Sequence, residues 1–496
     1  MKVLLISMPD VVPVIIHEAA VHLPNHGIAS IGGNIDDEHD VFLIDLVRKR
    51  RFIKKYLSKV IKKIQPDLVG LSSMAWQFDT CIKIAHLIKE LLPGVKIVIG
   101  GYHATLMSEE TGISQEAQWI DFIIRGEGEE SFRRLVNALG GRDTLADIAS
   151  LSYKVDGIFT HNPQSENLDL STLKLPVRDG RRLTWGYHLF NSKIELIETS
   201  RGCTRTCNFC SMKYMYGRTF RMYPISRVLA DIDDIYYKRK TRYIFITDDN
   251  MVLDPDRVIE LCDAIIAQDY QGLRFMVQAD CLSMAKNEKM VAKMAAAGFC
   301  SVFLGIENVS KKNLNSADKV DSGAFAKEAI ENCHKYKMMV IGGLIFGFPD
   351  DDEASIKENY EFFKDLQADA AYCQVLTPYP KTGMRQNLLD QDLITNKTDY
   401  KRYNGLWANV RTKYLDSEQL QYQFWYQRQA VLGWWNPPAE VKKLGWVWIS
   451  IWRFIFKPFL KLRYKRIMKK YGWEGRYLRE MERWENMNTF VDLEEY

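Results

Sequence analysis

Residues 201–210 read Arg-Gly-Cys-Thr-Arg-Thr-Cys-Asn-Phe-Cys, and the rest of the chain is interpreted outward from them. The three cysteines, Cys203, Cys207 and Cys210, follow an apolar run at 194–199 that predicts a buried strand. Three thiolates on one short loop can hold an iron–sulfur cube, and a closed site would need a fourth. The next cysteine lies far off in a predicted helix, which leaves one iron open to bind a substrate or cofactor. The motif therefore predicts catalysis rather than electron storage.

A zinc site, a purely structural cluster and free thiols are the alternatives for these cysteines. Zinc sites usually pair two C-x2-C units or add histidines. No histidine lies between His188 and His334, so the sequence argues against zinc.

The region around the motif alternates strand and helix patterns for about 190 residues. The candidate strands are Ile194–Thr199, Tyr243–Thr247, Arg274–Gln278, Ser301–Gly305, Val340–Phe346 and Tyr372–Leu376. Six such repeats predict an incomplete (β/α) barrel, whose active residues gather at the C-terminal strand ends.

The first 140 residues alternate in the same way. Their candidate strands are Val3–Ser7, Asp40–Asp45, Pro66–Ser72, Val95–Ile99 and Phe122–Arg125. This spacing predicts a parallel, doubly wound sheet, in which ligands sit beyond the C-terminal strand ends. Glycines at 100–101 and 126–128 fall at two of those ends, where they let a ligand come close to the backbone.

The cysteine loop, with Phe209 before its third cysteine, resembles the signature of the radical S-adenosylmethionine (SAM) enzymes. The segments of the first 140 residues resemble the cobalamin-binding domain that precedes many such barrels: Leu4–Pro9, 24–30, Pro66–Ser72, Gly100–His103 and Arg125–Glu129. The subgroup that this order resembles includes the anaerobic magnesium-protoporphyrin ester cyclase and the hopanoid methylases.

This resemblance implies an α/β chain in four parts. A doubly wound, Rossmann-like cobalamin-binding domain is expected at 1–142, and a connector at 143–190. A partial (β/α)6 TIM-type radical SAM barrel is expected at 191–395, and a mainly helical region at 396–496.

The resemblance also implies the cofactors and their residues. Cys203, Cys207 and Cys210 would hold a [4Fe–4S] cluster whose open iron binds SAM. The implied SAM contacts are Phe209, Asp248, Asp249, Gln278, Glu307, Ile345 and Pro378. The implied cobalamin contacts are Ser72, Ser73, Gly100, Gly101, Tyr102, Gly126, Glu127 and Gly128.

One departure concerns the lower ligand of cobalamin. A histidine ligand would come from a D-x-H-x-x-G motif, which the sequence lacks, because Asp10 and His17 do not have that spacing. Cobalamin is therefore expected without a histidine lower ligand. A domain that packs on the barrel and binds nothing is the alternative.

The C-terminal region has an unusual composition. Nine of the twelve tryptophans follow residue 396, and between Val441 and Trp473 there are ten basic residues and no acidic one. Aromatic rings interleaved with cations suit a helix lying in a membrane interface, so peripheral membrane contact through 441–473 is expected. A helical cap on the barrel mouth and an RNA contact are the alternatives.

Whole-chain composition limits the other classes. The 496 residues carry a net charge of +4, which gives no global case for nucleic-acid binding. No apolar stretch reaches the ~18 residues of a membrane span, and no export signal is visible. The protein is therefore expected in the cytoplasm, with peripheral contact on the inner face of the membrane.

The predicted function is reductive cleavage of SAM to a 5′-deoxyadenosyl radical, followed by methylation of an unactivated carbon. The expected substrate is hydrophobic, in the manner of a lipid, isoprenoid or tetrapyrrole, and the electron comes from a one-electron reductant such as flavodoxin or ferredoxin. Radical ring or carbon–carbon bond formation without methyl transfer is the alternative within enzymes. A non-catalytic cobalamin or iron–sulfur carrier and a membrane-associated binding protein are the alternatives from other classes. No catalytic acid, base or radical-quenching residue is assigned.

Overall fold

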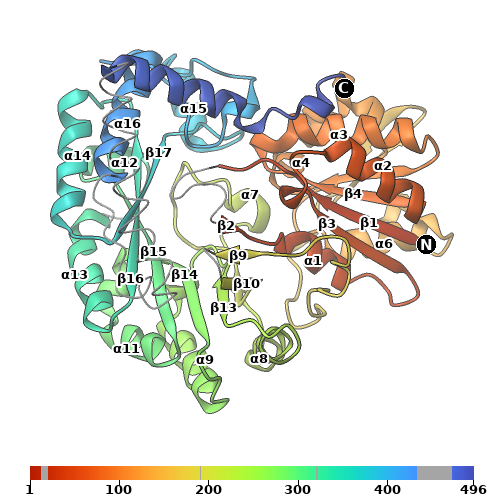
Figure 1. Cartoon of the computed structure of the whole chain (residues 1–496), viewed down its shortest axis with the longest axis horizontal. Coiled ribbons are helices and arrows are strands. Elements are labelled where there is room, and N and C mark those ends of the chain that lie inside the picture. Colours follow the sequence, from red (N-terminus) through yellow and green to blue (C-terminus); the bar gives the residue numbers. More distant parts are fainter. Residues whose placement is uncertain (13–20, 190–191, 320–321, 433–471) are drawn as a thin grey trace.

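The computed structural model describes residues 1–12, 21–189, 192–319, 322–432 and 472–496. Two α/β units lie side by side, with the N-terminal sheet on the right of Figure 1 and the larger, later sheet on the left. A short helix, α7 (Lys213–Tyr216), lies between them.

The N-terminal sheet has seven strands in the order β3-β1-β4-β5-β6-β7-β8. The first five are parallel, and β7 and β8 continue the sheet antiparallel. Their bounds are β1 Lys2–Ser7, β3 Asp40–Asp45, β4 Leu68–Ser72, β5 Lys96–Gly100, β6 Phe122–Ile124, β7 Leu151–Val155 and β8 Ile158–His161.

Helices cover both faces of this sheet. Residues of α1 (His26–Gly33) and α6 (Glu129–Leu139) share one apolar core, and those of α2 (Ile53–Ile64) and α3 (Phe78–Leu91) share the other. The short helices α4 (Tyr102–Leu106) and α5 (Ser108–Ile113) follow β5. Because both faces are covered, the strands are apolar on both sides, as in parallel α/β sheets.

The second sheet has the order β17-β16-β15-β14-β13-β10-β9-β2. Its six parallel strands are β10 Ser192–Ile197, β13 Tyr243–Ile246, β14 Arg274–Asp280, β15 Phe299–Glu307, β16 Met339–Phe346 and β17 Ala370–Val375. At one edge β9 (His188–Leu189) pairs antiparallel with β10, and β2 (Val21–His22) pairs antiparallel with β9. Within the described residues the sheet is open, with β17 at its other edge, so the expected partial barrel is confirmed.

The barrel strands alternate with helices: α8 Ile225–Asp233, α9 Pro255–Ala267, α10 Cys281–Lys286, α11 Glu288–Ala296, α12 Lys311–Ser316, α13 Ser322–Lys335 and α14 Glu353–Asp365. Side-chain caps fix several of their starts, because Asp254 accepts from the Arg257 amide and Asp352 accepts from the Ser355 amide. The outer faces of the strands are buried beneath these helices in one large apolar core.

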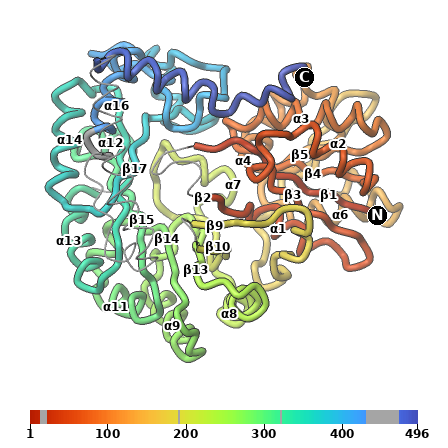
Figure 2. The backbone as a smooth tube through the Cα atoms, viewed as in Figure 1, coloured from red at the N-terminus to blue at the C-terminus, as the bar shows by residue number. Residues whose placement is uncertain are grey.

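The C-terminal region is helical, as expected, with α15 (Gly383–Asp390), α16 (Ser417–Leu432) and a helix at 472–485. The chain then returns to the N-terminal unit, a path that Figure 2 traces. Among the described residues, no helix is long and apolar enough to span a membrane. Residues 441–471 of the predicted membrane-contact segment lie outside the described residues.

All eleven strands expected from the sequence are present, within a few residues of their expected bounds. The division at residue 142 stays a prediction. Strands β7 and β8 fall in the expected connector, and they pair onto the N-terminal sheet.

Candidate active site

The cysteine loop leaves β10 through a tight backbone turn. Gly202 has a φ of +86°, and a Cβ atom there would lie 2.3 Å from the Thr219 carbonyl oxygen, so only glycine fits. At the base of the loop, β11 (Ser200–Arg201) pairs antiparallel with β12 (Arg221–Met222). The loop is thus closed at its base before the first cysteine.

Two adjacent aspartates after β13 hold this turn. The buried Asp248 carboxylate accepts hydrogen bonds from the Thr199 amide at 2.7 Å and from the Thr199 and Ser200 hydroxyls. Asp249 accepts from the Gly202 amide at 3.1 Å. Burial raises the pKa of the Asp248 carboxyl to about 6. Both carboxylates therefore organise the loop, and their role as SAM contacts stays a prediction.

The three thiols lie in an enclosed setting. Burial raises the pKa of Cys210 to about 12, and it also raises the pKa values of Cys203 and Cys207. Asn250 donates to Asp280 at 2.9 Å, and its amide lies 3.9 Å from the Cys203 sulfur. Thiolates in such a setting need a cationic partner, which the irons of a cluster would supply.

The donor type and the enclosure therefore fit an iron–sulfur cluster. Among the residues that the structure describes, no three His, Cys, Asp or Glu side chains already surround a common point as a formed metal site. The ligand role of Cys203, Cys207 and Cys210 accordingly stays a prediction.

The other predicted SAM residues lie at the same, C-terminal edge of the barrel. Gln278 of β14 donates to the Asp248 carbonyl oxygen, and Phe209 packs against the barrel core. Ile345 near the end of β16 and Pro378 after β17 are buried. All seven positions are therefore brought to one edge of the sheet, and their contact with SAM stays a prediction.

Glu307 ends β15 with a strained backbone. Its φ is +66°, and its carboxylate lies 3.0 Å from the Lys319 ammonium. Lys319, Cys207 and Asp280 line a small hollow of about 30 Å³. A non-glycine residue held in this conformation is typical of functional sites.

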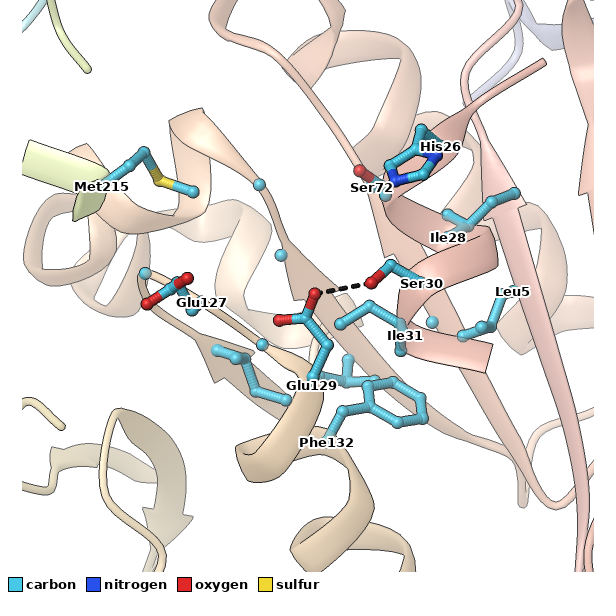
Figure 3. Close-up of a pocket in the computed structure, with 18 of the residues that line it drawn as sticks. Leu5, His26, Ile28, Ser30, Ile31, Ser72, Glu127, Glu129, Phe132 and Met215 are labelled. Carbon is cyan, nitrogen blue, oxygen red and sulfur yellow. Dashed lines mark hydrogen bonds between the residues drawn. The ribbon is translucent and has the colours of Figure 1, made fainter. Parts of the chain in front are cut away.

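A second cavity, of about 160 Å³, opens at the strand ends of the N-terminal unit (Figure 3). Its floor is apolar and lies between the sheet and helices α1 and α6; it includes Leu5, Val98, Ile124, Ile28, Ile31 and Phe132. Polar and charged groups line it as well, among them Ser72, His26, Glu127 and Glu129. On the barrel side, Arg201, Met215 and Tyr216 complete the lining, so this cavity adjoins the cysteine loop.

The cavity offers a ligand both apolar and polar surface. A Cβ atom at Gly100 would have no neighbour closer than 3.8 Å, whereas Gly101 has a φ of +97° and lies tight against the Ser73 backbone. His26 lines this space, and its buried Nδ1 atom has no hydrogen-bond partner among the described residues. Such an unpaired buried polar atom is what a ligand with amide groups would satisfy.

Six of the eight predicted cobalamin residues line this cavity: Ser72, Gly100, Gly101, Gly126, Glu127 and Gly128. Ser73 and Tyr102 do not line it. The Ser73 carbonyl oxygen accepts from the His103 amide, and Tyr102 begins α4. Burial, together with the charges of Tyr216, Asp249 and Cys210, raises the pKa of Tyr102 well above its usual range.

Several site residues were not among the contacts predicted from the sequence. They are His26, Glu129, Glu198 and Arg201, all of which line the cavity, and Asn250, Asp280 and Lys319 beside the cysteine loop. The available signal was a charged residue next to a strand-end glycine, as at Arg201 before Gly202 and Glu129 after Gly128.

Comparisons with known proteins agree with this geometry. Residues 12–136 match the B12 binding domain, and residues 197–363 match the Radical SAM superfamily. An uncharacterized methyltransferase of Pyrococcus horikoshii is 28% identical, over 85% of this chain and 90% of its own.

Two further relatives are 25% identical. The anaerobic magnesium-protoporphyrin IX monomethyl ester cyclase of Rubrivivax gelatinosus matches over 73% of this chain and 64% of its own. The hopanoid C-3 methylase of Methylococcus capsulatus matches over 87% and 84%.

The fold also matches a solved structure. The radical SAM methyltransferase TsrM from Kitasatospora setae, with cobalamin and a [4Fe–4S] cluster bound, superposes with a TM-score of 0.68 at 16% identity, covering 87% of this chain and 88% of that one. The chain belongs to the radical SAM enzymes that carry a cobalamin-binding domain before the barrel, and its cofactors are a [4Fe–4S] cluster, SAM and cobalamin.

Proposed function

We propose that this enzyme transfers a methyl group to an unactivated carbon of a hydrophobic small molecule. The observation that carries the proposal is the cavity at the N-terminal strand ends, which is walled on one side by the residues flanking the cysteine loop. Two cofactor sites that share a wall can act on one substrate held between them.

The N-terminal cavity would hold cobalamin. Its apolar floor suits the nucleotide base, and the glycines at 100–101 and 126–128 let the corrin ring approach the strand ends. His26 and Ser72, which line the cavity, offer hydrogen bonds to the amide side chains of the ring. Cobalamin, when bound, supplies the methyl group.

The cysteine loop would hold the cluster through Cys203, Cys207 and Cys210. The cluster and SAM, when bound, supply the 5′-deoxyadenosyl radical. The chain's own residues orient these groups: Asp248 and Asp249 fix the turn before Cys203, and Glu307 can accept hydrogen bonds from ribose hydroxyls once Lys319 moves aside.

The barrel interior supports an apolar substrate. Along β15, Val302, Leu304 and Ile306 are buried beneath the outer helices, so Phe303 and Glu307 face inward. The ring of Phe303 stands over Gly343, where a Cβ atom would lie 2.8 Å from it, and meets the Tyr372 ring edge to face at 5.5 Å. Together with Met276, Ile341 and Ile345, these rings give the interior an apolar lining.

Two further parts of the proposal concern partners. Each cleavage of SAM consumes one electron, which a flavodoxin or ferredoxin would deliver. Residues 441–473 would bind the membrane surface at which the enzyme meets a lipid-like substrate. Flotation of the protein with anionic vesicles tests this contact. Protein that stays wholly at the bottom of the gradient would contradict it.

The direct test uses protein purified without oxygen and reconstituted with iron, sulfide and hydroxocobalamin. With SAM and a strong reductant, the wild type should form both 5′-deoxyadenosine and S-adenosylhomocysteine. Cys207→Ala should form neither. Cys262→Ala, which removes a buried thiol of α9 far from the loop, should form both.

The outcomes separate the alternatives. Deoxyadenosine without S-adenosylhomocysteine would favour ring or carbon–carbon bond formation over methyl transfer. If the wild type and Cys262→Ala form neither product while iron remains bound, the protein is a non-catalytic carrier rather than an enzyme.

A further inference from the structure

Arg201 connects the two cofactor sites through buried ion pairs. Its guanidinium lies 2.9 Å from Glu127, 2.5 Å from Glu129 and 2.9 Å from Glu198. Glu127 and Glu129 belong to the N-terminal unit, whereas Arg201 precedes Cys203 by two residues. All four residues also line the N-terminal cavity.

Further groups extend this cluster. Arg221 of β12 lies 2.9 Å from Glu127, and His26 at the start of α1 lies 3.6 Å from Glu198. Ser30 of α1 donates to Glu129 at 2.7 Å, the bond drawn in Figure 3. We call His26, Glu127, Glu129, Glu198, Arg201 and Arg221 the Arg201 network.

The centre of the network is charged and buried. Arg201, Glu127 and Glu129 are each about 5% exposed. Burial alone would raise the pKa values of Glu129 and Glu198, but the Arg201 charge outweighs it and holds both below their usual range. Glu129 and Glu198 are therefore ionised at neutral pH. The pairs of Glu127 and Glu129 with Arg201 cross between the two units, whereas Glu198 pairs with Arg201 within the barrel unit.

We propose that the Arg201 network is a positioning device that fixes the cysteine loop against the cobalamin cavity and so sets the separation of the two cofactors. The bonds of a guanidinium are directional, and a buried guanidinium bridging three carboxylates tolerates little displacement of any of them. This inference rests on the proposed function, because it gives a reason for holding the two sites in register.

The test compares two network variants with a matched control. Glu129→Gln keeps the shape of the side chain and removes its charge. Arg201→Lys keeps the positive charge but loses the planar guanidinium that bonds several carboxylates at once. Asp231→Asn is the control: Asp231 and Arg178 form an equally buried ion pair at 2.5 Å, within a network that does not line the cavity.

The first readout is magnetic. In the reconstituted protein, the reduced cluster should split or broaden the electron paramagnetic resonance signal of cob(II)alamin by one well-defined dipolar coupling. In Glu129→Gln and Arg201→Lys, with both cofactors at wild-type stoichiometry, we expect a spread of couplings. Asp231→Asn should keep the wild-type coupling even if its melting temperature falls.

The second readout is the product ratio. Displacement of the loop should raise deoxyadenosine formed per S-adenosylhomocysteine by about tenfold or more in the network variants, because small misplacements of reacting groups cost large factors in rate. Unchanged coupling and ratio in both variants would overturn the positioning role and leave the proposed function standing. If the coupling differs between the wild type and the network variants, but the wild type forms no S-adenosylhomocysteine, the positioning role is supported and methyl transfer is overturned.

Discussion

Gly202 stands between the Arg201 network and the first cysteine, in a conformation that other residues avoid. Gly202→Ala should destabilise the fold by at least about 1–3 kcal/mol, because the positive φ is strained and the new methyl group would overlap the Thr219 carbonyl. Thermal unfolding measures this. The control is Gly94→Ala, whose Cβ atom would meet nothing within 4 Å and which should change stability by less than about 1 kcal/mol. Equal melting temperatures for the two variants would contradict the argument.

Asp10 is a buried carboxyl whose titration should be visible in folding stability. Burial raises its pKa to about 7, although Thr80 donates to it. The folded state thus holds a proton that the unfolded chain releases near pH 3.8, so stability should fall as pH rises from about 4 through 7.

Asp10→Asn should remove this pH dependence, and its free energy of unfolding at pH 8 should exceed that of the wild type by about 2–4 kcal/mol. Urea unfolding at a series of pH values measures it. Curves that run parallel for the two proteins across pH 5–8 would contradict the assignment.

Single residues also show where sequence analysis succeeds. The three cysteines and the strand-end glycines are local signals, each readable within about ten residues. The Arg201 network could not be read in this way, because its partners lie 72 and 74 residues apart along the chain. Asp248 was expected as a ligand contact from its place after a strand, but its hydrogen bonds to Thr199 and Ser200 arise only when two strands are aligned.

At the scale of elements, the strand ends of the N-terminal sheet and helices α1 and α6 form the cavity. Gly100→Leu should fill it and abolish cobalamin retention, while the cluster and deoxyadenosine formation persist, because Gly100 lines the cavity and its Cβ atom would meet nothing closer than 3.8 Å. Absorbance and cobalt content measure the loss. Gly94→Leu is the control, and full cobalamin content in Gly100→Leu would show that the cofactor binds elsewhere.

A C-terminal strap, residues 488–496, packs on α2 and α3 of the N-terminal unit. Phe490 and Leu493 are buried in that core, and the Lys54 amide donates to Asp492. Leu493→Ala should cost about 2–5 kcal/mol and speed hydrogen exchange in the strap. The control is Val491→Ala, because Val491 is 87% exposed and its truncation should leave stability and exchange unchanged. Equal hydrogen exchange in the two variants would contradict the role of the strap.

Elements differ in how far the sequence predicts them. Parallel strands and their helices carry a strong periodic signal, so the six barrel strands were found. The strands β2 and β9 carry almost no such signal, because a strand of two residues is too short to show a period. Their pairing brings residues 21–22 onto the barrel sheet. The strap was missed for the same reason: its two apolar anchors show no helix or strand pattern.

At the scale of the whole molecule, the two α/β units meet where both carry their strand ends, and the strap and the Arg201 network tie them together. This arrangement places the cobalamin cavity beside the cysteine loop. We propose that both sites serve one methyl transfer to a hydrophobic substrate.

Mass spectrometry with SAM carrying a trideuterated methyl group tests that claim most directly. The reconstituted enzyme, a reductant and fractions of hydrophobic cell extract are incubated without oxygen, and the products are compared with those of Cys207→Ala. The expected product is one compound heavier by about 17 Da, the mass of a trideuteromethyl group replacing a hydrogen, which the variant does not form. A product lighter by two hydrogens, without label and with deoxyadenosine released, would contradict methylation and establish oxidative ring or bond formation in its place.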